Sequence, residues 1–206
     1  MTSFKSVLPF AAAMALVVTA SNILVLYPFD HFGMKDLLTW GAFSYPIAFL
    51  VNDLTNRRYG KQAARRVVFA GFLIAVILSV WLATPRIAIA SGTAFLTGQL
   101  LDIQVFDRLR RQSWWKAPFM ATIFGSVLDT IIFFSLAFAA RFAFIDAAFG
   151  MADGSLAFPV PFFGGETSLW MALAFGDLCV KVLMGVLALI PYGALLNILR
   201  PAPGVA

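Results

Sequence analysis

Charged residues are scarce in this chain. Only 12% of its 206 residues are Asp, Glu, Lys or Arg, whereas 61% are hydrophobic. An ordinary soluble domain carries about 25% charged residues, so this chain has about half the usual charge. A globule of this length cannot hide so much apolar surface from water. The composition therefore disfavours a soluble enzyme, a disordered chain and a disulfide scaffold, and it favours a helical protein that crosses a membrane several times.

Cysteine and histidine are nearly absent. Because Cys179 is the single cysteine, no internal disulfide can form. The single histidine, His31, lies in a predicted loop and is expected to be solvated; Ser-His or Cys-His catalysis would depend on it alone. A zinc site would need several carboxylates and is not expected. The chain has no GxxxxGK[ST] phosphate-binding motif. We therefore expect no metal, no cofactor and no ATP hydrolysis by the chain itself.

Long apolar runs dominate the sequence. A membrane helix takes about 20 residues, and the runs predict an all-α protein with one membrane domain over residues 1–206. The six predicted spans are 7–27, 37–54, 67–83, 87–106, 117–140 and 169–190. The first run continues past a signal-peptide-like Val18-Thr19-Ala20, so it is read as a retained helix. Pro46 interrupts the second span, and the sixth is expected to stop or kink at Pro191.

Basic residues concentrate in the segments that six spans would place on one side. The terminal segments and the predicted 55–66 and 107–116 loops hold eleven: Lys5, Arg57, Arg58, Lys61, Arg65, Arg66, Arg108, Arg110, Arg111, Lys116 and Arg200. The other side holds three: Lys35, Arg86 and Arg141. Cytoplasmic loops carry such an excess, so both termini are predicted to be cytoplasmic. The basic clusters are therefore read as a topology signal rather than a nucleic-acid interface.

The longest predicted connection, 141–167, lies on the outer side and is rich in phenylalanine, proline and glycine. Aromatic residues outside a span favour anchoring at the membrane–water interface. A lid over an outward mouth is the alternative interpretation.

Several ionisable and amide side chains fall inside predicted spans, where charge is costly and commonly functional. Phe95, Gln99, Asp102 and Phe106 form one stripe at helical spacing. The fifth span holds Asp129, and the sixth holds Asp177 and Lys181, which can pair at i, i+4. Carboxylates, carboxamides and aromatic faces together suit a planar heterocycle with N–H donors. These residues alone leave open a purine-like ligand, a vitamin or a proton relay.

Several short strings resemble one known family in their order and spacing, from about residue 20 to residue 199. They are Ser21-Asn22; Thr39-Trp40-Gly41-Ala42-Phe43; Asp53-Leu54-Thr55; Tyr59-Gly60; Ala64-Arg65-Arg66; Gly98-Gln99-Leu100-Leu101-Asp102 with Phe106; Arg108-Leu109-Arg110; Trp114-Trp115; Ala117-Pro118; Phe124-Gly125 with Asp129-Thr130; and Asp177 with Lys181-Val182-Leu183. Together they are similar to the bacterial queuosine precursor transporter family, also called the vitamin uptake transporter family. The sequence departs from the family pattern at Ser126, where an asparagine is usual, and in its extended 141–167 segment.

The resemblance implies an inner-membrane importer of 7-cyano-7-deazaguanine, a free deazapurine base that is later built into tRNA. Such a protein contacts the small molecule and the lipid bilayer but not nucleic acid directly. The predicted site combines the polar span residues with candidate stacking rings: Asn22, Trp40, Gln99, Asp102, Phe106, Asp129, Asp177 and Lys181. Asp102 and Asp129 would accept from the N–H groups, and Lys181 would hold Asp177 or contact the ligand.

Alternatives stay open at this stage. Within transport, another heterocyclic vitamin or nucleobase is the main competitor, and the chain could be the membrane subunit of a larger system. Outside transport, buried carboxylates could belong to an intramembrane enzyme, although no Ser/His pair lies inside a span. A structural or assembly protein would not need so many buried carboxylates. The sequence does not predict the oligomeric state or the energy coupling.

Overall fold

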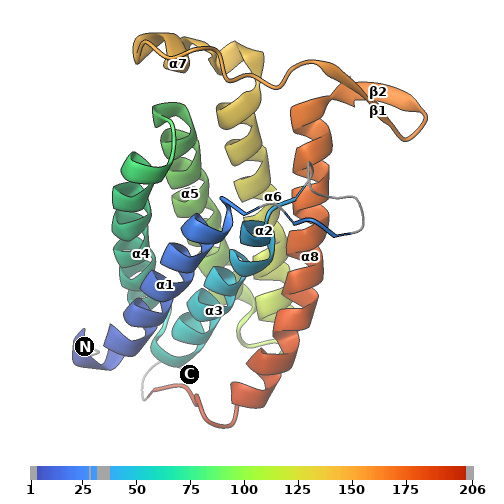
Figure 1. Ribbon diagram of the computed structural model, residues 1–206. Coiled ribbons are helices and arrows are strands. Elements are labelled where there is room, and N and C mark those ends of the chain that lie inside the picture. The colour runs from blue at the N-terminus through green and yellow to red at the C-terminus, as the bar shows by residue number, and fades with distance from the viewer. Residues whose placement is uncertain (1–3, 28, 32–37, 203–206) are drawn as a thin grey trace.

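A computed structural model describes residues 4–27, 29–31 and 38–202 of the chain. Apart from one short hairpin, the regular secondary structure of the described part is helical. Its long helices are α1 (Phe4–Leu24), α4 (Lys61–Leu82), α5 (Pro85–Leu109), α6 (Lys116–Phe138) and α8 (Leu169–Leu195). They stand side by side as a bundle, with the start of α1 and the end of α8 at the same end (Figure 1). We call this the terminal end of the bundle and the other the far end.

Four of the described helices are long and apolar enough to cross a bilayer: Ser6–Leu24, Lys61–Leu82, Lys116–Phe138 and Leu169–Leu195. The outer surface of the bundle is correspondingly apolar. Trp81 and Ile190 are 84% and 72% exposed, as befits side chains that face lipid rather than water. The prediction of an α-helical, multi-pass membrane protein is therefore confirmed.

The predicted second span is wrong in its boundaries. The chain forms two helices here, α2 (Trp40–Ser44) and α3 (Ile47–Tyr59), which are separated at Tyr45 and Pro46. Proline has no backbone N–H and its ring clashes with the preceding helical turn, so Pro46 begins a new helix instead of continuing the old one. The predicted start of the span, Leu37, and the predicted outer cation Lys35 lie outside the described residues.

The predicted 55–66 loop is also wrong. Helix α3 continues to Tyr59, and α4 begins at Lys61, so Gly60 alone connects them. Gly60 has φ 82°, in the region that side chains disfavour and glycine adopts freely. The basic residues of this segment therefore lie on the last turn of α3 and the first turns of α4.

Helix α8 does not stop at Pro191 but continues to Leu195. The 141–167 connection contains more structure than expected. It holds a 3-10 turn, η1 (Ala140–Phe142), the short helix α7 (Phe144–Ala148) and an antiparallel hairpin of β1 (Pro159–Phe162) and β2 (Gly165–Ser168). Figure 1 shows this segment crossing the far end of the bundle, from beside α5 and α6 to the start of α8.

Two glycines bring α5 and α6 into close contact. A Cβ added to Gly125 would lie 2.7 Å from Cε1 of Phe49 and 3.1 Å from the carbonyl oxygen of Gly98. A Cβ on Gly98 would lie 3.0 Å from Cβ of Asp129. Small residues at a helix–helix contact allow the two backbones to approach closely. The close approach also sets the acidic residues of the two helices beside one another.

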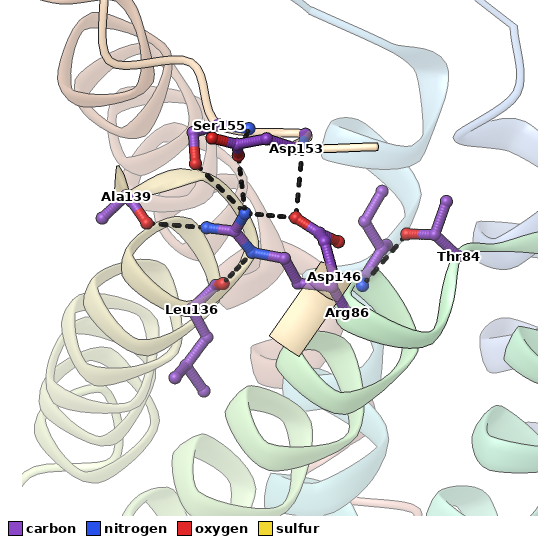
Figure 2. A network of polar contacts seen from close by, with 9 residues as sticks. Thr84, Arg86, Leu136, Ala139, Asp146, Asp153 and Ser155 are labelled. Atoms are coloured by element: carbon purple, nitrogen blue, oxygen red, sulfur yellow. Dashed lines mark hydrogen bonds and ion pairs between the residues drawn. The ribbon is translucent and has the colours of Figure 1, made fainter. Parts of the chain in front are cut away.

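A buried arginine fastens the 141–167 connection to the bundle. Arg86, at the start of α5, is 1% exposed. Its Nε donates to the carbonyl of Leu136 at 2.8 Å, and its two terminal nitrogens donate to the carbonyl of Ala139 and to Oδ2 of Asp146, each at 2.6 Å (Figure 2). Asp153 lies 3.6 Å away. Arg86 thus donates to carbonyls at the end of α6, where the helical N–H partners run out, and pairs with an acid of α7.

Candidate functional site

A cavity of about 350 Å³ lies inside the far half of the bundle. Its walls come from the second halves of α1, α4 and α6, from α2, and from the first halves of α5 and α8. The polar residues among its lining are Ser21, Asn22, Thr39, Tyr45, Ser79, Ser91, Asp129, Asp177 and Lys181. The volume falls within the range of small-molecule sites, about 300–1,000 Å³.

Aromatic rings from α5 and α6 form much of the apolar wall. Phe95, Phe133, Phe134 and Phe138 line the cavity. Phe133 stands nearly perpendicular to both Phe134 and Phe138, with ring centroids 5.1 and 5.9 Å apart. These rings offer faces against which a planar ligand can stack.

The ammonium of Lys181 links two acids at the bottom of the cavity. Its Nζ lies 2.7 Å from Oδ2 of Asp129 on α6 and 2.5 Å from Oδ2 of Asp177, one turn away on α8. The three side chains are 5%, 4% and 15% exposed, in the order Lys181, Asp129, Asp177. The predicted i, i+4 pair of Asp177 and Lys181 is therefore confirmed, and Asp129 joins it from a second helix.

Two hydroxyl groups complete this arrangement. The Tyr45 hydroxyl donates to Oδ1 of Asp129 at 3.0 Å, and the Thr130 hydroxyl donates to Oδ2 of Asp177 at 2.9 Å. The Thr130 oxygen also accepts from Lys181 at 3.1 Å. We call Tyr45, Asp129, Thr130, Asp177 and Lys181 the floor cluster. It draws together α6, α8 and the residue between α2 and α3, so the cavity ends where these elements meet.

The structure divides the eight predicted site residues into two sets. Asn22, Asp129, Asp177 and Lys181 line the cavity. The other four, Trp40, Gln99, Asp102 and Phe106, do not contribute to its lining. Trp40 is 41% exposed and packs edge-on against Phe29 and His31 beside the cavity.

Gln99 and Asp102 belong to a second polar layer, nearer the terminal end. Asn52 on α3 donates from Nδ2 to Oδ2 of Asp102 at 2.8 Å and to the carbonyl of Gln99 at 3.2 Å. All three side chains are fully buried. Four of their side-chain atoms have no hydrogen-bond partner within the described residues: Oε1 and Nε2 of Gln99, Oδ1 of Asn52 and Oδ1 of Asp102. Buried polar groups are normally paired, so this layer holds unused hydrogen-bonding capacity.

Phe106 lies further along α5 than Gln99 and Asp102, closer to the terminal end. It is fully buried and meets Tyr192 edge-to-face at 6.4 Å, in an apolar cluster with Leu54, Ala117 and Ala121. The stripe from Phe95 to Phe106 therefore reaches from the cavity wall to the apolar core near the terminal end. Eleven residues advance about 16 Å along a helix, which is why one face of α5 passes through three environments.

Tyr45 is the functional candidate that the sequence analysis missed. Its hydroxyl contacts Asp129, and Nζ of Lys181 lies 5.5 Å from the centre of its ring. The available signal was its position directly before Pro46, inside a broken span. Irregular backbone inside a membrane protein commonly lines a cavity, and a polar aromatic residue at such a break is a natural candidate.

The chain matches the family model described as "Putative vitamin uptake transporter" over residues 39–84 and 79–195. No solved structure matches the chain significantly.

Three curated proteins are similar to it. The "Queuosine precursor transporter" of Escherichia coli K12 is 38% identical over 206 aligned residues, which cover 89% of this chain and 83% of that protein. The "Probable queuosine precursor transporter" of Haemophilus influenzae is 32% identical, with the same coverage of each. A Bacillus subtilis protein with the same printed name is 26% identical over 57% of this chain and 63% of its own length.

Proposed function

The chain belongs to the vitamin uptake transporter family, and we propose that it imports a queuosine precursor, 7-cyano-7-deazaguanine, across the bacterial inner membrane. The observation that carries this proposal is the cavity with its floor cluster. Charged groups inside a membrane protein are costly and mark substrate or ion pathways. Here two carboxylates and an ammonium lie at the base of a cavity with aromatic walls.

The proposed topology has six crossings: α1, α2 together with α3, α4, α5, α6 and α8. The basic residues support a cytoplasmic terminal end, because those of separate segments meet there. Arg110 donates to the carbonyl of Arg57 at 3.1 Å, and Arg58 donates to the carbonyl of Arg200 at 3.3 Å. Cytoplasmic ends are enriched in Lys and Arg. The cavity then lies in the periplasmic half, where an imported substrate arrives.

We assign the substrate contacts as follows. Asp129 accepts from the N–H groups of the guanine-like edge, Asn22 contacts the ring from α1, and Lys181 is held between Asp129 and Asp177. The base stacks on the phenylalanines of the cavity wall, and Trp40 stands at the outer entrance. Carboxylates and amides that contact exocyclic amines recur in base recognition, and the walls supply the apolar area that such sites need.

In this proposal the substrate meets Gln99, Asp102 and Phe106 after it has left the cavity. The layer of Asn52, Gln99 and Asp102 lies on the terminal side of the floor cluster, and its unpaired amide and carboxyl atoms remain available for a polar ligand. In the proposed path the substrate passes from the floor cluster to this layer and then along Phe106 towards the cytoplasm.

Complementation tests the proposed function. In a bacterial strain that cannot make the precursor but can convert it, the wild-type chain is expected to restore queuosine in tRNA when 7-cyano-7-deazaguanine is supplied. Asp129→Asn and Asp102→Asn are each expected to reduce this uptake at least tenfold, with membrane abundance checked by immunoblot. Full uptake by both variants would reject the proposed site.

Binding to the purified protein tests the substrate. We expect the cyano-deazaguanine to bind more tightly than guanine or any member of a vitamin panel. Tighter binding of guanine, or of one vitamin, would reassign the substrate while leaving a transport function in place.

A further inference from the structure

The cavity does not balance its own charge. Its lining contains four ionisable side chains, Tyr45, Asp129, Asp177 and Lys181. The elements α1, α4 and α5 contribute only neutral residues to the described lining. Two carboxylates therefore share one ammonium, and the floor cluster carries one net negative charge when both acids are ionised.

Such a charge is unfavourable in this place. Asp129 and Lys181 are almost fully buried, in a half of the molecule whose outer surface is apolar. A buried ion pair stabilises only when its charges are matched and hydrogen-bonded. The negative charge of the second carboxylate has no partner of its own, so it has to be neutralised by a cation that enters the cavity.

Asp129 and Asp177 differ in their capacity to bind such a cation. Both oxygens of Asp129 are occupied, Oδ1 by Tyr45 and Oδ2 by Lys181. The described contacts of Asp177 all fall on Oδ2, which meets both Thr130 and Lys181. Asp177 is also the most exposed of the three charged groups. Its other oxygen, Oδ1, is therefore the open position of the floor cluster.

The ammonium of Lys181 decides which kind of cation can enter. It lies within 2.7 Å of a carboxylate oxygen of each acid, on Oδ2 of Asp129 and Oδ2 of Asp177. A metal ion would need several oxygen ligands at about 2.0–2.6 Å, and the ammonium already occupies the space between the two acids. A proton needs one oxygen and no such space.

We infer that Asp177 is a proton-binding site and that uptake is coupled to the inward movement of one proton per substrate molecule. This inference rests on the proposed transport function. A proton from the periplasm bonds to Oδ1 of the Asp177 carboxylate, which becomes a neutral carboxylic acid. The ion pair from Asp177 to Lys181 is lost, the pair from Lys181 to Asp129 remains, and the floor cluster becomes neutral. The same O–H bond breaks when the cavity opens to the cytoplasm, and the proton leaves there.

The test uses the full-length protein in sealed phospholipid vesicles with radiolabelled 7-cyano-7-deazaguanine. Counterflow against unlabelled substrate needs binding and translocation but no driving force. Net uptake is then measured with an inside-alkaline gradient of one pH unit, with a sodium gradient instead, and with neither, at zero membrane potential. We expect about tenfold accumulation with the pH gradient, since one pH unit is worth a factor of ten for one proton, and no accumulation with sodium.

The outcomes are separable. Counterflow without pH-driven accumulation would overturn the coupling and leave the transport function intact. Accumulation with sodium alone would overturn the assignment to a proton. An absence of counterflow by the wild type would contradict the proposed function itself.

Variants test which acid carries the proton. Asp177→Asn is expected to lower the ratio of pH-driven accumulation to counterflow from about ten to about one, and Asp177→Glu, which keeps a carboxyl group, to restore most of it. Asp30→Asn, an exposed acid outside the cavity lining, is the matched control and should keep the wild-type ratio. Accumulation by Asp177→Asn would overturn the assignment to Asp177.

A second measurement keeps the assignment testable if Asp177→Asn loses counterflow. Calorimetry of substrate binding in buffers with different ionisation enthalpies reports protons taken up on binding. Wild type and Asp177→Glu are expected to take up protons near neutral pH, whereas Asp177→Asn is expected to bind the substrate with equal enthalpies in all buffers. Equal enthalpies for the wild type would contradict proton binding at the cavity, and proton uptake by Asp177→Asn would overturn the assignment to Asp177.

Discussion

The contacts of Arg86 predict a large and specific loss of stability when the side chain is removed. Arg86→Met removes the ion-pair partner of Asp146, which is 5% exposed, and the side-chain donor to the carbonyls of Leu136 and Ala139. The Ala139 carbonyl keeps the backbone N–H of Phe142 as a donor. Removing one partner of a buried ion pair costs about 3–5 kcal/mol. With about 2–4 °C per kcal/mol for a chain of this length, a loss of 3 kcal/mol lowers Tm by about 6–12 °C.

The assay is thermal unfolding of the purified protein in detergent. Arg86→Lys is expected to recover only part of the loss, because an ammonium cannot meet two carbonyls and a carboxylate with the fixed geometry of a guanidinium. The control is Arg141→Met, an exposed arginine at the same end of the bundle whose guanidinium lies over the ring of Phe142. It should change stability by no more than about 1 kcal/mol.

A double variant provides the decisive comparison. Arg86→Met with Asp146→Leu removes both charges, and apolar replacement of a whole buried pair is commonly close to neutral. The double variant should therefore be more stable than Arg86→Met alone. Equal stability of the two, or an Arg86→Met variant with a wild-type Tm, would refute the reasoning that an uncompensated Asp146 is the main cost.

Three further predictions follow from single contacts. Gly125→Ala places a Cβ 2.7 Å from Cε1 of Phe49 and 3.1 Å from the carbonyl oxygen of Gly98, and should lower stability by about 1–3 kcal/mol. Gly176→Ala meets no atom within 4 Å and should leave stability unchanged. A neutral Gly125→Ala would contradict the inference that α6 is tightly packed against α3 and α5 at this position. Tyr45→Phe removes the hydroxyl donor to a carboxylate, a hydrogen bond worth about 1.5–3 kcal/mol, and should weaken substrate binding at least tenfold; unchanged affinity would remove Tyr45 from the site. Hydrogen bonds from the side chain and backbone of Ser155, with the nearby Arg86, lower the pKa of Asp153, so its stabilising effect is complete above its usual value of 3.8 and is lost as the pH falls through the lower folded value. Asp153→Asn should thus lower Tm at pH 7 and lose this difference in strong acid; a difference independent of pH would contradict the interpretation.

The helical architecture could be predicted from the sequence because an apolar run long enough to cross the bilayer can satisfy its own backbone hydrogen bonds in lipid only as a helix. Five of the predicted spans overlap one long helix each. The second failed at Pro46, where the apolar run hides a break, and at Tyr59, because the polar end of α3 carries no hydrophobic signal yet remains helical. A segment rich in charged residues resembles a loop in composition, although the backbone hydrogen bonds of a helix do not depend on whether its side chains are charged.

Contacts between side chains on different helices were harder to predict from the sequence. Asp177 and Lys181 could be matched because four residues bring side chains onto one helix face. Asp129 and Lys181 are 52 residues apart, and Arg86 and Asp146 are 60 apart, so only the packed bundle determines those contacts. The sequence places Arg86 only among the outer-side topology residues. Its burial depends on the start of α5 and the end of α6 meeting α7, a helix that the sequence does not predict.

The single-residue connection at Gly60 has a mechanical consequence. With one residue between them, the end of α3 and the start of α4 cannot move far apart, so a displacement of one end is transmitted to the other. The break at Tyr45 and Pro46 is the nearest interruption of the helix on the other side of α3, and Tyr45 contacts Asp129. A displacement of α3 would therefore change the Tyr45 contact at the floor of the cavity.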